Sequence, residues 1–521
     1  MMHRRALGRL AVSMALMPWL RTPLAAGVAA APWRSQPFTL GVASGQPRPD
    51  GAVLWTRLAP DDEDFLTDTQ RKTVAVSYEV YSDDALRRPV TRGEVLTDAQ
   101  RGYSVHVPLS GLAPDRPYWY RFTSGDAVSA TGRTRTAPAP QAAVGRLRLA
   151  LASCQHYEQG WFTAHRDLAA QDIDLVLFVG DYIYEGSNPR RMVAPAQRRH
   201  TGGIPRSLAE YRARYALYRR DPDLQAAHAA HPWLVTWDDH EVVNDYAGGL
   251  DPKGGDPQLF LQRRVAAYRA WFEHMPVELP AGQQPGVPMR IHQQLSWGQL
   301  ADLWMLDCRQ YRSPHACPDP LRGGGRILLG CAELADPART LLGAEQEQWL
   351  ADGLARSARG WKFVAQSTLI NPWGVVTPLG RSAYSDGWDG YPQARERLMT
   401  ALAAAGGANV VTLGGDVHMA VAADLRRHAG DTASPVIASE LVTTSISSRG
   451  LSDTVVDGIR QSNADIHHAR ADERGYTLLD LRADRLEAQF RTTAHPVLPD
   501  SRLQRQASFV VQRGRPQVER G

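Results

Sequence analysis

The sequence predicts a layered α/β domain preceded by a small all-β domain. Residues 38–136 contain short alternating strand patterns, whereas the chain after residue 145 alternates unbroken apolar runs with helical stretches. Alternation is typical of half-buried strands, and unbroken apolar runs are typical of strands covered on both faces. A length of 521 residues allows two cores. The Pro/Ala-rich segment APAPQAAVG, residues 137–145, is the expected linker between them.

Residues 1–30 predict a bacterial export signal. Arg4 and Arg5 precede an apolar run at 10–20, and small residues follow it. This run is too short for a permanent membrane-spanning helix, so we expect no stable membrane anchor. The adjacent arginines favour the twin-arginine (Tat) export machinery as a partner, although His3 stands where a serine is usual. We therefore expect a periplasmic or secreted protein.

Residues 37–136 predict a β-sandwich. The segments TVAVSYEVYSD (73–83) and GYSVHVPL (102–109) alternate, and PYWYRF (117–122) is rich in strand-forming residues. The phrase LSGLAPDRPYWYRF resembles the late strands of fibronectin type III and immunoglobulin-like sandwiches.

Residues 146–500 form the expected α/β domain. Its strand candidates are the apolar runs at 147–152, 175–179, 233–237, 303–306, 363–366 and 410–413. The tail, residues 501–521, either caps the active site or packs as part of a β-layer. Charge adds one exclusion: the net charge is only +4 and no block of like charge occurs, which argues against nucleic acid as the main partner.

Four cysteines have different expected roles. Cys317 and Cys331 bracket a short Pro/Gly-rich loop, which favours a disulfide in an exported protein. Cys308 could pair with either of them, so the pairing stays open. Cys154 instead ends a strand-like run.

Four predicted strands end on polar residues that can bind metal. These residues are Cys154 after LRLALAS, Asp181 and Tyr184 in VLFVGDYIYEG, Asp238 to Glu241 after HPWLVTW, and Asp416 and His418 after NVVTLGG. Ligands of layered α/β proteins bind beyond the carboxyl ends of the strands. Thiolate, carboxylate, phenolate and imidazole groups gathered at one edge therefore predict a metal site.

The donor types indicate which metals to expect. A phenolate and a thiolate on one ion suit Fe³⁺, whereas an oxygen-rich neighbouring set suits a harder divalent ion such as Ca²⁺ or Mn²⁺. If Asp181 bridged both ions, its carboxylate could tolerate burial at the end of an apolar strand.

The order of these motifs resembles a known family. SCQ, GDYIYEG, WDDHEVVND and GGDVHMA, in this order, resemble the PhoD family (alkaline phosphatase D), a branch of the calcineurin-like metallophosphoesterases. Further phrases agree, among them LGVASGQPRPDGAVLWTRL, LDCRQYRS and SELVTTSISS. The resemblance covers nearly the whole chain after the signal. It implies a four-layer α/β/β/α metallophosphoesterase sandwich with a PhoD-type N-terminal sandwich domain.

The resemblance also implies site residues. The positions matching the iron ligands are Cys154, Asp181, Tyr184 and His418. Asp181 would bridge to the second ion, usually calcium, whose other ligands would be Asn244 and Asp416. Asp239 is the alternative to Asn244, because Asp239 and His240 fall where other branches have an Asn-His pair; Asn244 is favoured.

The function implied is exported hydrolysis of phosphate mono- and diesters by a metal-activated hydroxide at a two-metal site. His240, with Asp239 beside it, would assist the leaving group as a catalytic residue. Arg309 would either stabilise phosphate or pair with Asp307. The substrate is expected to be a small-molecule, lipid or polymer phosphoester. Two alternatives remain: a phospholipase D-type activity on the same fold, and an exported binding protein with a structural metal site.

Overall fold

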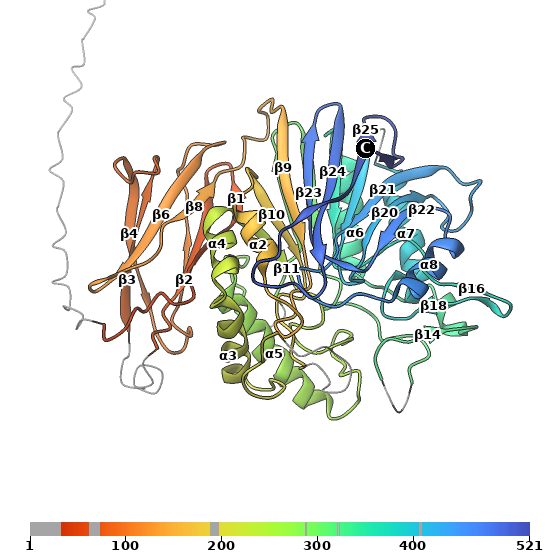
Figure 1. Cartoon of the computed structure of the whole chain (residues 1–521), viewed down its shortest axis with the longest axis horizontal. Helices are drawn as coiled ribbons and strands as arrows, with labels where there is room; N and C mark the ends of the chain where they lie inside the picture. Colours follow the sequence, from red (N-terminus) through yellow and green to blue (C-terminus); the bar gives the residue numbers. More distant parts are fainter. Residues whose placement is uncertain are drawn as a thin grey trace, which may run out of the picture.

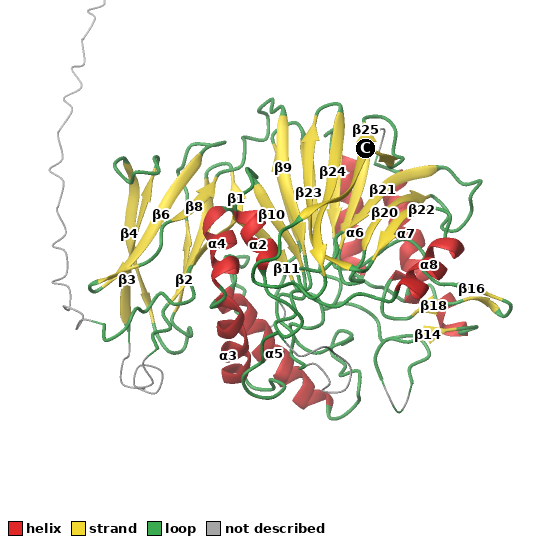
Figure 2. Ribbon diagram, viewed as in Figure 1, coloured by secondary structure: helices red, strands yellow, loops and turns green. Residues whose placement is uncertain are grey.

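Two large β-sheets face each other across the centre of the molecule, and helices cover their outer faces (Figure 1, Figure 2). This is a computed structural model that describes residues 33–61, 73–187, 197–286, 289–319, 321, 323–405 and 409–521. The expected export signal, residues 1–30, lies outside the described residues. In the part of the chain that is described, no helix has the length and apolar character needed to cross a membrane.

The first sheet has ten strands. In spatial order they are β26 (Glu519–Arg520), β25 (Gln504–Gln512), β24 (Arg485–Ala494), β23 (Glu473–Arg482), β9 (Arg146–Ala152), β10 (Leu175–Val179), β11 (Pro232–Thr236), β1 (Val42–Arg48), β2 (Gly51–Arg57) and β5 (Ser104–Pro108). The central strands β9, β10 and β11 are parallel. Because side chains alternate along a strand, β10 sends Leu177 into the core between the sheets and Phe178 into the core beneath the helices.

The second sheet has seven strands. In spatial order they are β12 (Gln293–Trp297), β13 (Ala301–Met305), β15 (Trp361–Ala365), β19 (Asn409–Gly414), β21 (Val436–Val442), β20 (Ala420–Arg426) and β22 (Ile466–Arg470). Its strands β13, β15, β19 and β21 run parallel. Phe363 and Leu413 of this sheet meet Leu149 and Phe490 of the first sheet in a buried core.

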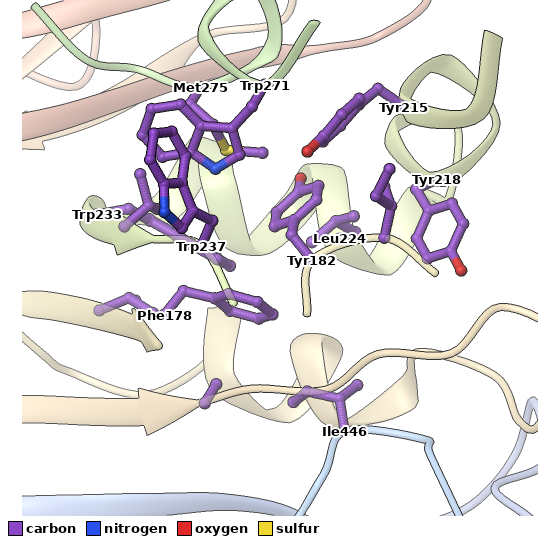
Figure 3. Packing of buried hydrophobic residues seen from close by; sticks show 14 of the residues in the cluster. Phe178, Tyr182, Tyr215, Tyr218, Leu224, Trp233, Trp237, Trp271, Met275 and Ile446 are labelled. Carbon is purple, nitrogen blue, oxygen red and sulfur yellow. The ribbon is translucent and has the colours of Figure 1, made fainter. Parts of the chain in front are cut away.

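Helices cover both outer faces. The first sheet carries α2 (Thr163–Ala169), α3 (Leu208–Arg219), α4 (Pro222–Ala230) and α5 (Pro257–His274), and the second carries α6 (Ala344–Arg356), α7 (Pro392–Ala403) and α8 (Asp453–Ser462). Local sequence starts these helices: Ser207 and Glu210 form a capping box on α3. Figure 3 shows the core under α3 to α5, where Tyr182 lies near Tyr215 and Trp237. The result is the expected α/β/β/α layering.

The N-terminal all-β region is a sandwich that shares a sheet with the α/β part. Its outer sheet contains β4 (Pro89–Thr97), β3 (Val74–Tyr81), β6 (Pro117–Ser124), β7 (Ala127–Val128) and β8 (Gly132–Arg135). These strands pack on β1, β2 and β5 through a core that includes Val42, Leu54 and Tyr120. Because β1 pairs in parallel with β11, the inner sheet of the sandwich (β1, β2 and β5) is part of the ten-stranded sheet.

The tail after Asp500 lies in the sheet. Strand β25 pairs with β24 from Gln504 to Gln512, and the amide of Gly514 then donates to Asn409 Oδ1 at 2.6 Å. Asn409 begins β19 of the second sheet. The tail therefore reaches the end of that sheet that lies opposite the carboxyl ends of its parallel strands. Of the two alternatives considered for the tail, these contacts correspond to packing in a β-layer rather than to capping the site.

Short elements complete the fold. They are β14 (Ile327–Leu328), β16 (Val376–Thr377), β17 (Gly380–Arg381), β18 (Ala383–Tyr384) and the 3₁₀ turns η1 (Ala332–Ala335) and η2 (Trp388–Gly390). A disulfide joins Cys317 to Cys331, with their Cα atoms 6.3 Å apart. Cys154 and Cys308 are buried free thiols, so Cys308 does not compete for the pairing.

Candidate metal centre

The strand ends bring three overlapping sets of metal-binding side chains together. Within each set the ligand atoms lie within 4.8 Å of one another, and the sets are Cys154, Asp181 and His418; Asp181, Asp239 and His240; and Asp181, Asp238 and Asp416. Asp181, which follows β10, belongs to all three. A carboxylate shared between adjacent donor sets is the arrangement that a bridging ligand requires.

The backbone bends sharply where it presents these side chains. Cys154, Asp181, Asp416 and His418 all have a positive φ, between 53° and 61°. Residues with a Cβ rarely adopt this region, and such residues cluster at functional sites. Gly180 allows the bend before Asp181: a Cβ there would lie 2.5 Å from the Cβ of Asp238. Close packing therefore requires a glycine at position 180, the first residue of the GDYIYEG motif.

Tyr184 lies between two of the proposed iron ligands. Its hydroxyl donates to Asp181 Oδ2 at 2.8 Å and lies 3.1 Å from His418 Nε2. The Nδ1 of His418 donates to the Arg449 carbonyl at 2.7 Å, which leaves Nε2 directed at the site. Ser448, which sequence reasoning did not single out, donates its hydroxyl to Tyr184 at 2.8 Å.

Tyr182 points away from the metal centre, into the core beneath the helices. Its hydroxyl lies 2.9 Å from His228 Nε2 and its ring packs in the core beneath the helices (Figure 3). The two tyrosines of the motif therefore have separate roles.

The site is buried and strongly acidic. Burial raises the pKa of Asp181 well above its usual range, and the neighbouring carboxylates Asp238 and Asp239 raise it further. Burial and nearby carboxylates likewise raise the pKa of Asp416 and of the Cys154 thiol. Cations would offset this clustered charge, and the mixture of sulfur, nitrogen and oxygen donors fits them.

Asp239 and Asn244 differ clearly in their surroundings. Asp239 is only 3% exposed, and its Oδ1 has no hydrogen-bond partner, with Arg309 Nη2 at 3.7 Å. Asn244 is exposed, and its backbone amide donates to Glu185 Oε1 at 3.0 Å. A buried oxygen without a hydrogen bond requires an explanation, and a bound cation supplies one.

Arg309 forms ion pairs with two carboxylates that the sequence did not predict as its partners. Its guanidinium donates to Asp238 at 2.5 and 3.2 Å and to Asp386 at 2.8 and 2.9 Å. The expected ion pair with Asp307 is not formed by this guanidinium. Asp307 instead accepts the backbone amide of Arg309 and the indole of Trp237, both at 3.0 Å.

Asp386 carries no local signal in the sequence. Burial alone would raise its pKa, but Arg309, Arg312 and His315 hold the pKa well below its usual range. Asp386 also forms a further acidic cluster with Asp239 and Asp245.

His240 has a buried carboxylate partner. Its Nδ1 donates to Glu185 Oε2 at 2.7 Å, and its ring contacts that of Tyr184 in a tilted arrangement, with centroids 4.1 Å apart. Burial would lower the pKa of His240, but Glu185, Asp181 and Asp239 together raise it well above its usual value. Glu185, missed from sequence, has its pKa lowered to about 2, because His240 and backbone amides outweigh burial.

Glu241 ties two strand ends together. Its carboxylate accepts the backbone amides of Tyr182 at 2.6 Å, Asp238 at 2.9 Å and Asp181 at 3.2 Å. The sequence analysis placed Glu241 among the polar residues at this strand end, but it did not predict that the carboxylate binds backbone amides.

Comparisons with known proteins agree with this geometry. The family model for PhoD-like phosphatase matches residues 149–490, and the model for the PhoD-like phosphatase N-terminal domain matches residues 24–138. Alkaline phosphatase D of Bacillus subtilis (strain 168) is 40% identical over 476 residues, or 90% of this chain and 80% of that protein. A solved structure described as "Structure of PhoD" has a TM-score of 0.88 at 38% identity and covers 94% of this chain and 93% of its own. This chain belongs to the PhoD-like phosphatase family.

Proposed function

We propose that the protein hydrolyses phosphate mono- and diesters at a centre of two cations. Family membership makes it a metal-dependent phosphoester hydrolase. The observation that supports two ions is the sharing of Asp181 among three donor sets. The remaining alternative from another class, a binding protein with a structural metal site, has no comparable support.

We assign Fe³⁺ to the set that contains sulfur and phenol donors: Cys154, Asp181, Tyr184 and His418. The second ion, Ca²⁺ or Mn²⁺, is assigned to Asp181, Asp416 and Asp239. Asp239 replaces Asn244 in this proposal, because its buried Oδ1 lacks a hydrogen bond, whereas Asn244 is exposed.

The protein's own groups have distinct tasks in this reaction. When bound, the two cations supply Lewis acidity, which stabilises charge on the phosphoryl oxygens and lowers the pKa of water. His240 donates a proton to the leaving oxygen, a role that contributes about 10²–10⁴ in rate. Glu185 keeps that imidazole oriented and charged. Glu241 fixes the backbone that carries Asp181. Arg309 holds Asp238 and Asp386 in place.

Export to the periplasm or the medium is the second part of the proposal. It rests on the paired Arg4 and Arg5 and on the apolar run behind them. Replacing both arginines with lysine should leave the protein in the cytoplasm, which cell fractionation of the native host would reveal. Normal export of that variant would contradict the twin-arginine route.

The central experiment pairs metal analysis with a small ester panel. Protein folded in its native host is assayed for iron and calcium, then tested on p-nitrophenyl phosphate, bis(p-nitrophenyl) phosphate and phosphatidylcholine. We expect two metals per chain and hydrolysis of the first two esters. Asp181→Asn should lose metal and activity, whereas the exposed control Asp172→Asn should keep both. A metal-replete wild type that hydrolyses none of the esters would overturn the proposal, and release of choline from phosphatidylcholine as the dominant activity would favour the phospholipase D alternative.

A further inference from the structure

An apolar cavity of about 330 Å³ opens directly beside the metal centre. Asp416 and His418, two of the proposed metal ligands, belong to its wall, and Trp373, Val375 and Val455 line the rest of it, among others. It lies at the end of the molecule where α8, β16 and β18 gather (Figure 1). A molecule bound by its phosphate at the centre could therefore place an attached group in this cavity.

The wall of the cavity is held in place before anything binds. The backbone amides of Trp373 and Gly374 donate to Asp389 Oδ2 at 3.3 and 3.1 Å, and Asp389 pairs with Arg395 at 2.6 Å. The ring of Trp373 meets Tyr384 edge to face at 5.3 Å. A preformed cavity binds its ligand without first losing conformational freedom of the wall.

The chemistry of the wall selects an apolar group. Among the described residues that line the cavity, none is lysine or arginine, so a second anionic group has no ion-pair partner there. The hydroxyl of Ser382 accepts the amide of Val375 at 2.9 Å and donates to its carbonyl at 3.2 Å. This hydroxyl is therefore occupied, which leaves the phenol of Tyr384 as the remaining hydroxyl of the described wall.

The mouth of the cavity exposes further apolar surface. Ile327 is 69% exposed and Val455 is 44% exposed, and both line the opening. These two side chains extend the apolar wall of the cavity toward the solvent.

We propose that this cavity binds the aryl or alkyl group of the phosphoester substrate while the phosphate occupies the metal centre. The inference rests on the proposed function and adds a substrate class to it: esters of apolar alcohols and phenols. The volume is at the lower end of small-molecule pockets, which suits an aromatic ring or a short alkyl chain. Burial of each methylene should raise kcat/KM about fourfold until the cavity is full.

The test uses metal-replete protein and a series of alkyl p-nitrophenyl phosphate diesters, from methyl to octyl, each below its critical micelle concentration. The leaving group is constant, so kcat/KM reports the alkyl group alone. We expect a steep rise with chain length that levels off. Val455→Gln and Leu451→Gln should flatten this rise. Leu379→Gln, a control residue that is 82% exposed and outside the cavity lining, should leave the rise intact.

The outcomes separate this inference from the proposed function. In an active wild type, a flat chain-length series together with a kcat/KM that Val455→Gln and Leu451→Gln leave unchanged would overturn the apolar pocket alone, because neither the alkyl nor the p-nitrophenyl group would then use it. If the wild type hydrolysed no ester, the proposed function would fail, and calorimetric titration with alkylphosphonates would still decide the pocket: affinity rising with chain length supports it, and constant affinity overturns it. A rate increase found only above the micelle concentration, or only on phosphatidylcholine vesicles, would overturn the single-molecule pocket in favour of a lipid surface.

Discussion

Glu185→Gln should lower the pH at which His240 stops donating a proton. The two side chains are 2.7 Å apart and largely buried, with 7% and 19% of their surfaces exposed. Since the pKa of Glu185 is lowered to about 2, its carboxylate is ionised at every working pH. Burial lowers the pKa of His240, and Glu185 is foremost among the groups that raise it. Glutamine keeps the shape of the side chain and removes the charge, so the pKa of His240 must fall.

The geometry sets the size of this shift. Two unit charges about 4 Å apart at an effective dielectric constant of about 20 interact by about 4 kcal/mol, which corresponds to about 3 pH units. Opposite charges at such distances shift pKa values by about 1–3 units in proteins. The protonated imidazole is the active form, so activity is lost as the pH rises through its pKa. The alkaline limb of the variant should therefore lie about 1–3 pH units lower than that of the wild type.

The assay is the pH dependence of kcat/KM for phenyl phosphate, whose poor leaving group needs the proton. p-Nitrophenyl phosphate, with a better leaving group, should show a smaller loss at high pH. Glu440→Gln is the matched control, because that buried carboxylate accepts the backbone amides of Ile370 and Asn371 instead. An unmoved alkaline limb in a Glu185→Gln variant with normal metal content would refute the reasoning.

Three further predictions concern stability and metal content. Arg309→Met should lower the free energy of unfolding by about 3–5 kcal/mol, because it leaves the buried carboxylate of Asp238 without its ion-pair partner; chemical denaturation measures this, and a loss below 1 kcal/mol, about the value of a surface pair, would contradict the buried network. Replacing Cys317 and Cys331 with serine should lower it by about 3 kcal/mol, since their separation of 14 residues closes a loop in the unfolded chain; equal stability of the oxidised wild type and the variant would argue against that contribution. Asp239→Ala should lose the divalent ion while Asn244→Ala retains it, as measured by elemental analysis, and the reverse pattern would restore Asn244 as the ligand.

The parts of the site set by short segments could be predicted from the sequence. Asp181 and Tyr184 are three residues apart after a buried strand, and the turn that follows brings the phenol within 2.8 Å of the carboxylate. Asp416 and His418 follow β19 in the same way. In each case the distance along the chain is short enough that strand, glycine and turn together determine where the side chain lies.

The contacts between distant segments could not be predicted. Arg309 meets Asp386 across 77 residues, and Glu185 meets His240 across 55, with no local pattern to join them. The pairing of β1 with β11 could not be predicted either, because an edge strand of a sandwich and a central strand of a sheet have similar sequence patterns. A Pro/Ala linker marks a change of texture, but it does not reveal that hydrogen bonds continue from one region to the other.

The distribution of charge explains why Arg309 matters to the metal centre. Asp238 and Asp386 each form close ion pairs with its guanidinium. Within the described residues, no lysine or arginine forms an ion pair with Asp181 or Asp416, and Asp239 has only the 3.7 Å contact. Arg309 thus neutralises Asp238 and Asp386, whereas Asp181 and Asp416, which we assign to the ions, have no such ion pair with a described residue. A buried carboxylate without a partner is costly, so the same charges that destabilise the metal-free site provide the affinity for two cations. Metal removal should therefore lower the free energy of unfolding of the wild type more than it lowers that of the Asp181→Asn variant, because the variant already lacks one of these charges.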